Sequence, residues 1–375
     1  MQGGERYLSY LDERGFADTS DPITTAAQPP RERPAPNHDD VLLRNVPLPL
    51  RAVFYPMGFA VEIVTNSLEV LAAAEESWGQ FVQVFSRRTI ELRLGVMDTG
   101  STECPPEVIY RAHRNLRTLI ADQDNFCVCD LTQGFAFGWL TRAAVEHPNY
   151  LRYYFLEAAN SFFLIDSSCV TLLHAACVKM AGHGVLLCGD SGAGKTSLAF
   201  ACVRAGWTYL SDDLVLLAEG GEDHVVIGNP HMFRFRDSAA DLFPELIGER
   251  ISPHAVSKPT IEFSSERVPQ INIADKCRVS YIVFLNRRDP DPPGLVSYPR
   301  DLAKRWFELG VDADEHREAR LAAIHNLLTV EILELRYSDL DFAVEELEKL
   351  VLKVVPNRSR GIEHREGRYQ QLLIL

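Results

Sequence analysis

The order of apolar and polar positions divides the chain into an arm, two patterned regions and a tail. Residues 1–40 are rich in Pro, Arg, Asp and Thr and have few core-forming side chains, which predicts a flexible arm. Residues 41–165 mix alternating and helical patterns and predict an N-terminal α+β domain, for which no catalytic pattern is visible. Within it we expect strands over 53–63, 81–96, 126–129 and 135–139, and helices over 67–78, 105–114 and 150–163.

Residues 166–355 carry a longer succession of strand and helix patterns and predict a second domain of the α/β (α+β) class. Two apolar strands, 171–180 and 184–188, are joined by the turn 181–184, and a helix over 195–204 ends at Gly206. Further strands are expected over 207–210, 214–217, 225–227, 233–236, 279–285 and 329–335, and helices over 300–309, 314–328 and 340–354. Residues 356–375 predict a loose tail.

Composition and charge narrow the class of protein. The 375 residues are 46% hydrophobic and 24% charged, which is typical of a soluble globular chain long enough for two domains. The formal net charge of −14 argues against binding nucleic acid non-specifically or docking on an anionic membrane, because both need a basic face. The sequence has neither a signal-peptide pattern nor a run of roughly 20 apolar residues. We therefore expect a cytoplasmic protein.

Eight cysteines are present, and none of them forms a C-x-x-C pair. Most have apolar neighbours, which favours buried thiols in a reducing compartment over metal or disulfide roles. Cys127 and Cys129 are two residues apart and share one face of an expected strand, which suits packing and is poor spacing for zinc.

The strongest chemical signal is the pattern G-x-x-x-x-G-K-T at residues 189–196, called the glycine loop below. It lies between a buried strand and an amphipathic helix, which is the context in which such a loop binds phosphate. Lys195 is expected to reach the β- and γ-phosphates of ATP, and the Thr196 hydroxyl to ligate Mg²⁺. The predicted cofactor-binding residues are Gly189, Asp190, Ser191, Gly192, Ala193, Gly194, Lys195 and Thr196.

Two acids, Asp212 and Asp213, follow the strand after the helix of the loop. A helix of about eleven residues travels roughly 16 Å, and a strand of about five residues covers a similar distance back. The acids are therefore expected at the level of the glycine loop, on the neighbouring strand if the sheet is parallel there. One carboxylate is suited to accept the proton of an attacking hydroxyl and the other to hold Mg²⁺. A solvated turn or a helix cap is the alternative.

His174 lies 21 residues before Lys195, inside an apolar strand pattern. A single histidine in such a stretch is more often a core residue than a catalytic one, and the residues alone leave both readings open.

Together, His174, the glycine loop and the passage that ends in Asp212 and Asp213 resemble the catalytic domain of the bacterial HPr kinase/phosphorylase family. The likeness runs without a gap through residues 174–213 and extends over about 166–290. It implies that His174 lies beside the transferred phosphate, that Asp212 shuttles the proton, and that Asp213 helps Thr196 to organise Mg²⁺. It also implies a P-loop core similar to phosphoenolpyruvate carboxykinase, with ATP as donor and a protein serine as acceptor.

One signature of that family is missing. After residue 213 the chain has no acidic residue followed by Ile-Arg-Gly-Leu-Gly-Ile-Ile, and the corresponding region is residues 228–236. That signature serves HPr and the reverse reaction, so its loss argues against HPr as acceptor and against phosphorylase activity. Arg234 and Arg236 share one face of the strand expected there, which suits phosphate binding and equally an exposed edge strand.

Three functions remain open at this point. The first is an ATP- and Mg²⁺-dependent serine kinase that acts on a protein or peptide. The second is a kinase of a small molecule or a ribosomal peptide, which the missing signature favours. The third is a non-catalytic regulatory protein in which bound ATP shifts conformation. A homo-oligomer is compatible with each of them.

Overall fold

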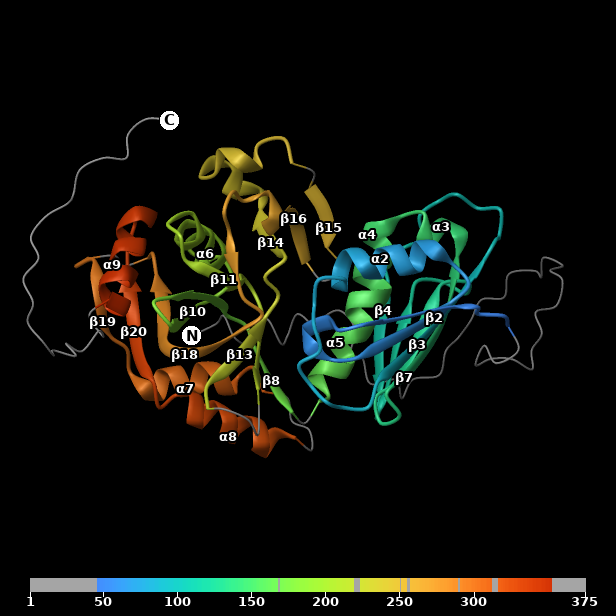
Figure 1. Ribbon diagram of the computed structural model, residues 1–375, viewed down its shortest axis with the longest axis horizontal. Coiled ribbons are helices and arrows are strands. Elements are labelled where there is room, and N and C mark those ends of the chain that lie inside the picture. The colour runs from blue at the N-terminus through green and yellow to red at the C-terminus, as the bar shows by residue number, and fades with distance from the viewer. Residues whose placement is uncertain are drawn as a thin grey trace, which may run out of the picture.

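The computed structural model describes residues 46–167, 169–218, 223–249, 251–254, 257–288, 291–311 and 316–352. The expected arm, 1–40, and tail, 356–375, lie outside these residues. Figure 1 shows two bodies side by side, one with strands β1 to β7 and the other with strands β8 to β20. The mixed α/β architecture is confirmed, while the exact domain boundaries stay predictions.

The first body is built on a seven-stranded sheet in the order β1-β2-β3-β7-β6-β5-β4. Strands β2, β3 and β7 are parallel and the outer pairs are antiparallel. Its strands are β1 (Leu50–Phe54), β2 (Val61–Thr65), β3 (Ile90–Met97), β4 (Ile109–His113), β5 (Leu116–Ile120), β6 (Phe126–Asp130) and β7 (Phe135–Thr141).

Helices pack on this sheet and close the core of the first body. They are α2 (Leu68–Trp78), α3 (Arg142–Val145), α4 (Pro148–Leu151), the π-helix η2 (Arg152–Glu157), α5 (Ala158–Ile165) and the short η1 (Pro56–Gly58). Val70 and Trp78 of α2 share this core with Ile63 of β2 and Leu92 of β3. The alternating burial of side chains along the strands points one face of the sheet at these helices.

Three predictions in this region are wrong. The strand expected over 53–63 is two strands, β1 and β2, with the short helix η1 between them. Residues 105–114 were expected to be helical but contain β4, an edge strand that pairs antiparallel with β5. Every second side chain of β4 is exposed, and such half-exposed strands give a weak periodic signal. Residues 81–89 were expected within a strand and have no regular structure, because β3 begins only at Ile90.

The second body is built on a branched sheet of ten strands. Its main order is β17-β11-β9-β10-β18-β13-β12-β8, and β20 pairs with both β18 and β19. Near the centre, β10 runs antiparallel to β9 and parallel to β18. The strands are β8 (Val170–Leu173), β9 (Ala176–Met180), β10 (His183–Cys188), β11 (Thr208–Ser211), β12 (Val215–Ala218), β13 (Val225–Gly228), β17 (Asn272–Ile273), β18 (Lys276–Asn286), β19 (Gly294–Ser297) and β20 (Glu331–Arg336).

Helices cover both faces of this sheet (Figure 1). Val185 and Leu187 of β10 pack with α6 (Lys195–Arg204) and α9 (Leu340–Leu352) on one face. Leu186 and Cys188 pack with α7 (Arg300–Glu308) and α8 (Arg317–Leu327) on the other. A strand buried on both faces needs apolar residues at every position, which explains the continuous apolar run before the glycine loop.

The second body also contains a three-stranded sheet in the order β14-β16-β15, which lies on its side towards the first body in Figure 1. Phe233 and Phe235 of β14 pack edge-on against Phe200 of α6, which ties this small sheet to the helix that follows the glycine loop. Its elements are β14 (Met232–Arg236), β15 (Ile251–His254), β16 (Ser257–Ser264) and the short helices η3 (Asp237–Asp241), η4 (Pro244–Leu246) and η5 (Ser265–Arg267).

The single strand expected over 171–180 is two strands in the structure. Strand β8 pairs with β12, whereas β9 pairs with β10 and β11. The chain therefore changes partners at His174 and Ala175, where the Ala175 N–H donates to the Leu173 carbonyl at 3.0 Å. His174 consequently lies at a junction between two strands and not within one.

The cysteines follow the expectation of unpaired thiols. All eight are free, seven are buried, and Cys104 is exposed. Within the residues that the structure describes, no helix combines the length and the apolar character needed to cross a bilayer. The cytoplasmic location stays a prediction.

His231 is one of the residues through which the two bodies contact each other. Its ring packs edge-on against Phe81 of the first body, with the ring centroids 5.0 Å apart. Both ring nitrogens are buried and have no hydrogen-bond partner among the described residues. Burial lowers the pKa of His231 from its ordinary 6.5, against the opposite effect of Asp275 and Glu266. The neutral imidazole is therefore the form that this interface favours.

The substitution His231→Gln tests this interface. Because the folded-state pKa lies below 6.5, the unfolded chain takes up a proton first as the pH falls. The stability that neutral His231 contributes is thus complete above the ordinary pKa of 6.5, which the unfolded chain has. It is lost as the pH falls from there through the lower folded-state pKa. We expect the free energy of unfolding to fall less in the variant than in the wild type between about pH 7.5 and 5.5. Urea unfolding measures this difference, and equal losses would contradict a buried neutral imidazole.

Candidate functional site

Strand register brings His174 to the glycine loop. Ala176 of β9 lies opposite Leu187 of β10 in an antiparallel pair. His174 is two residues before the first and Gly189 two residues after the second, so they are level at the same edge of the sheet. A histidine at the junction of two strands is thereby placed beside the start of the loop.

Register also returns the two acids to this edge. Ser211, the last residue of β11, lies opposite Cys177 of β9, and Asp212 and Asp213 follow it directly. The strand β11 runs parallel to β10, which agrees with the expectation that the chain returns to the level of the loop after its helix. The expected adjacency of these two strands is wrong, however, because β9 lies between them.

The glycine loop has a backbone that only glycine adopts readily. Gly189, Gly192 and Gly194 have φ of 147°, 88° and 97°. A Cβ at Gly189 would approach the Ala193 Cβ to 2.9 Å, whereas nothing lies within 4 Å of one at Gly192. The first backbone N–H groups of α6 have no acceptor inside their own helix. These donors therefore lie next to the open space beside Gly192. That combination fits an anion such as a phosphate.

A chain of polar contacts crosses the loop. Lys195 is 6% exposed, and its Nζ donates to the Gly189 carbonyl at 2.9 Å and lies 3.0 Å from His174 Nε2. An ammonium has only protons to offer, so Nε2 accepts and the ring proton is on Nδ1. His174 Nδ1 lies 3.3 Å from Asp213 Oδ1. The carboxylate, the imidazole and the ammonium are thus linked in a row.

Burial sets the protonation of this row. Burial lowers the pKa of Lys195, and the carboxylate of Asp213 is the largest influence against that shift. Burial also lowers the pKa of His174, with Asp213 acting against the shift and Lys195 adding to it. A neutral imidazole is the form that accepts from an ammonium, so the pKa shift and the geometry agree.

The two acids have different surroundings. Asp212 is 5% exposed, and its carboxylate accepts from the Tyr209 hydroxyl at 3.2 Å and from the Arg234 backbone N–H at 2.9 Å. Burial and then the charge of Asp213 raise the pKa of Asp212 to about 6. The side chain of Asp213 is 52% exposed. The first environment suits proton transfer, and the second suits a ligand that shares its ion with water.

The predicted magnesium ligands are Thr196 and Asp213. Thr196 lies in the first turn of α6, directly after Lys195. Across the described part of the chain, no three His, Cys, Asp or Glu side chains gather as a metal site. Mg²⁺ fits a sparser set, because it keeps several waters and takes oxygens from phosphates. The two residues fit that requirement, and their role as ligands stays a prediction.

Two arginines border the glycine loop. Arg236 Nη2 donates to the Ser191 hydroxyl at 2.7 Å, so β14 reaches over the loop. A Cβ built at Gly194 would lie 3.5 Å from Arg287 Nη1 and 3.1 Å from the Tyr337 hydroxyl. The Phe-Arg alternation of residues 233–236 signals Arg236 in the sequence. Arg287 belongs to no motif and was missed.

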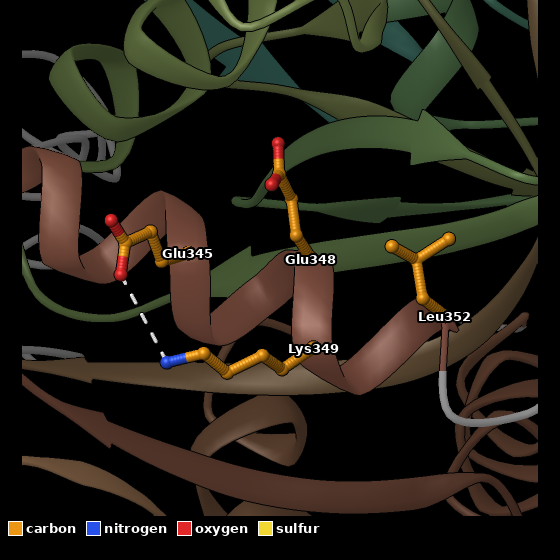
Figure 2. A pocket seen from close by; sticks show the side chains of 4 residues that line it. All are labelled: Glu345, Glu348, Lys349 and Leu352. Atoms are coloured by element: carbon orange, nitrogen blue, oxygen red, sulfur yellow. Dashed lines mark ion pairs between the residues drawn. The ribbon is translucent and has the colours of Figure 1, made fainter. Parts of the chain in front are cut away.

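A separate hollow of about 410 Å³ lies on α9. Figure 2 shows its lining, and Lys349 there pairs with Glu345 of the same helix at 3.9 Å. Ligand sites are usually enclosed between several elements, whereas the residues that line this hollow all belong to one helix. It is not a candidate site. The lining residues are Glu345, Glu348, Lys349 and Leu352.

Residues 167–235 match the family model of the HPr Serine kinase C-terminal domain. The match includes His174, the glycine loop and both acids. This segment is related to the HPr kinases. The resemblance drawn from the sequence of residues 174–213 is confirmed.

Other comparisons add little to the HPr-kinase relation. The solved structure of the Hpr(Ser) kinase/phosphatase from Coxiella burnetii matches over 49% of this chain and 92% of that one, with 12% identity and a TM-score of 0.27. A TM-score this low supports no conclusion about shared architecture or activity. None of the curated proteins matches the chain. The relation therefore rests on residues 167–235.

The substitution Gly192→Ala tests whether the loop binds ATP. A methyl group there would enter the open space beside the loop and strain a left-handed backbone by about 1–2 kcal/mol. We expect Mg²⁺-dependent ATP binding to weaken by about tenfold or more in isothermal titration.

Gly182 in the β9–β10 turn provides a matched control. Its φ is 87° against 88° at Gly192, and nothing lies within 4 Å of a Cβ built at either position. Gly182→Ala thus carries the same strain away from the loop, and we expect it to bind ATP as the wild type does. Equal affinities in both variants would show that the loop does not hold the nucleotide.

Proposed function

We propose that the chain is an ATP- and Mg²⁺-dependent kinase that transfers the γ-phosphate of ATP to a serine hydroxyl of a protein or peptide. The observation that supports it best is the row Asp213, His174 and Lys195 across the glycine loop. A phosphate cradle alone would serve any nucleotide-binding protein. A glycine loop beside an imidazole and two carboxylates has the groups that phosphoryl transfer requires.

The cations of the site are arranged for a polyphosphate. Lys195 is buried, and the groups that its Nζ contacts are a carbonyl oxygen and a neutral imidazole, neither of which carries a negative charge. A buried ammonium bound only to neutral groups strongly favours an anionic ligand. Arg236 and Arg287 add positive charge at the rim of the loop. These three cations make the surroundings of the loop locally positive, although the chain as a whole has a formal net charge of −14.

Asp212 is proposed to accept the proton of the attacking hydroxyl. With a pKa of about 6 it is ionised at neutral pH and still basic enough to take a proton. Tyr209 and the Arg234 N–H orient the carboxylate, and each oxygen keeps a second lone pair. His174 holds Lys195 in place through its Nε2. Thr196 and Asp213 would hold Mg²⁺, which when bound neutralises charge on the phosphates.

The acceptor is proposed from the family relation. The region that corresponds to the missing signature, residues 228–236, includes the last residue of β13, a turn and β14, and its Arg236 contacts the loop instead. Recognition of the acceptor therefore differs from that of HPr, and a protein or peptide other than HPr is the proposed class. A small molecule or a ribosomal peptide would use the same chemistry.

One observation favours a second candidate, a regulatory protein that binds ATP without transferring it. Asp212 is nearly fully buried and both of its oxygens accept hydrogen bonds. An acceptor hydroxyl reaches this carboxylate only after a local movement. A nucleotide-dependent conformational change without transfer would need no such access.

The substitution Asp212→Asn separates the two candidates. An amide of nearly the same shape cannot take the proton, so we expect phosphotransfer to fall by about 10²-fold or more while ATP affinity is kept. The measurement uses γ-labelled ATP with a lysate of the source organism as the acceptor pool. Lys195→Ala serves as the control that loses both binding and transfer.

Two outcomes would contradict the proposal that Asp212 is the base of a transfer reaction. Transfer at the wild-type rate in Asp212→Asn would rule out this carboxylate as the base. ATP binding by the wild type with no labelled product under any condition would favour the regulatory candidate.

A further inference from the structure

Arg234 connects the acid Asp212 to both bodies of the molecule. It lies on β14, an edge strand, and its backbone N–H donates to Asp212 at 2.9 Å. Its guanidinium donates through Nη2 to Glu157 at 2.8 Å and through Nε to Glu262 at 3.2 Å. Glu157 belongs to η2 of the first body and Glu262 to β16. A single residue thus joins three elements that are far apart in the sequence.

The carboxylates around Arg234 belong to a larger network at the junction of the bodies. Arg152, whose side chain is 3% exposed, pairs with Glu76 of α2 at 2.7 Å. The same guanidinium lies 3.7 Å from Glu157 and 4.0 Å from Glu262. Glu157 and Glu262 therefore each face two arginines, while Glu76 pairs with Arg152.

The charges around Arg234 are paired and largely shielded from water, with side-chain exposures of 28% for Arg234, 24% for Glu157 and 11% for Glu262. Burial acts to lower the pKa of Arg234, but Glu157 and Glu262 raise it overall, so the guanidinium stays charged. Ser77 of α2 donates to the other oxygen of Glu157 at 3.2 Å and fixes its orientation. Removing one member would leave a buried charge without its partner. Glu157 also ends a π-helix, a rare geometry that is frequently found at functional sites.

We propose that Arg234 is a positioning residue for Asp212 and that Glu157 of the first body holds it in place. Glu157 and Glu262, from different elements, hold the guanidinium of Arg234 and so position β14. The Arg234 backbone N–H then donates to Asp212. The first body, for which the sequence indicates no role, thereby helps to position Asp212, the proposed proton acceptor. This inference rests on the proposed function, in which Asp212 is the base.

The isosteric variants Glu157→Gln and Glu76→Gln of the full chain form a matched test. Each removes one carboxylate of the first body from the same network, but only the first touches Arg234. Amide hydrogen exchange over residues 232–236 reports the contact with Asp212 and needs no activity. We expect exchange to be about tenfold or more faster in Glu157→Gln and within about twofold of wild type in Glu76→Gln.

Steady-state phosphotransfer gives the second readout. Glu157→Gln is expected to lower kcat about tenfold or more, because the base is misplaced, while KM for ATP stays within about twofold. Strand β14 also contacts the glycine loop through Arg236 and Ser191, but the contacts of Lys195 with Gly189 and His174 lie outside this network, so ATP binding is expected to change little. Glu157→Asp keeps the charge and is expected to restore part of kcat.

Wild-type exchange and wild-type kcat in Glu157→Gln would overturn the inference. Equal changes in Glu76→Gln would also overturn it, because they would show a general loss of stability at the junction. If the wild type transfers no phosphate, the proposed function fails and Arg234 has no catalytic role. Hydrogen exchange then shows separately whether Glu157 keeps the Arg234 N–H on Asp212.

Discussion

The buried ammonium of Lys195 is the constraint on which the arrangement of the site depends. A charge that is 6% exposed has lost most of its hydration, which costs several kcal/mol unless nearby groups replace the water. The Gly189 carbonyl, the neutral imidazole of His174 and, behind it, the carboxylate of Asp213 replace it here. These groups come from separate segments, so the register of β9, β10 and β11 must hold for the ammonium to remain buried.

The two neighbouring acids, Asp212 and Asp213, have different surroundings and belong to different networks. Asp213 faces His174 and, through it, the ammonium, whereas Asp212 faces Tyr209 and the backbone of Arg234. Neighbouring residues thus belong to two different networks, one inside the glycine loop and one that runs to the first body. The HPr-kinase-related segment contains both acids, but its second network extends beyond that segment to Glu157 and Glu262.

Local parts of the site could be predicted because they depend on short patterns. The apolar strand, the glycine loop and the helix that starts at Lys195 lie where the sequence places them. Strand order could not be predicted, because the insertion of β9 between β10 and β11 depends on pairing between distant segments. For the same reason an apolar run concealed the change of partner at His174, and no motif marked Arg287 or Glu157. Arg287 meets the loop only through the packing of the second body, and Glu157 meets Arg234 only where the two bodies contact each other.

A crystal structure of the full chain with Mg²⁺ and a non-hydrolysable ATP analogue tests the central claim most directly. We predict phosphate oxygens on the amides of the glycine loop and on Lys195 Nζ, with the metal between the Thr196 hydroxyl and Asp213. A nucleotide bound elsewhere, or a metal remote from Asp213 while Lys195 keeps its contacts with Gly189 and His174, would contradict a shared site for nucleotide and acids.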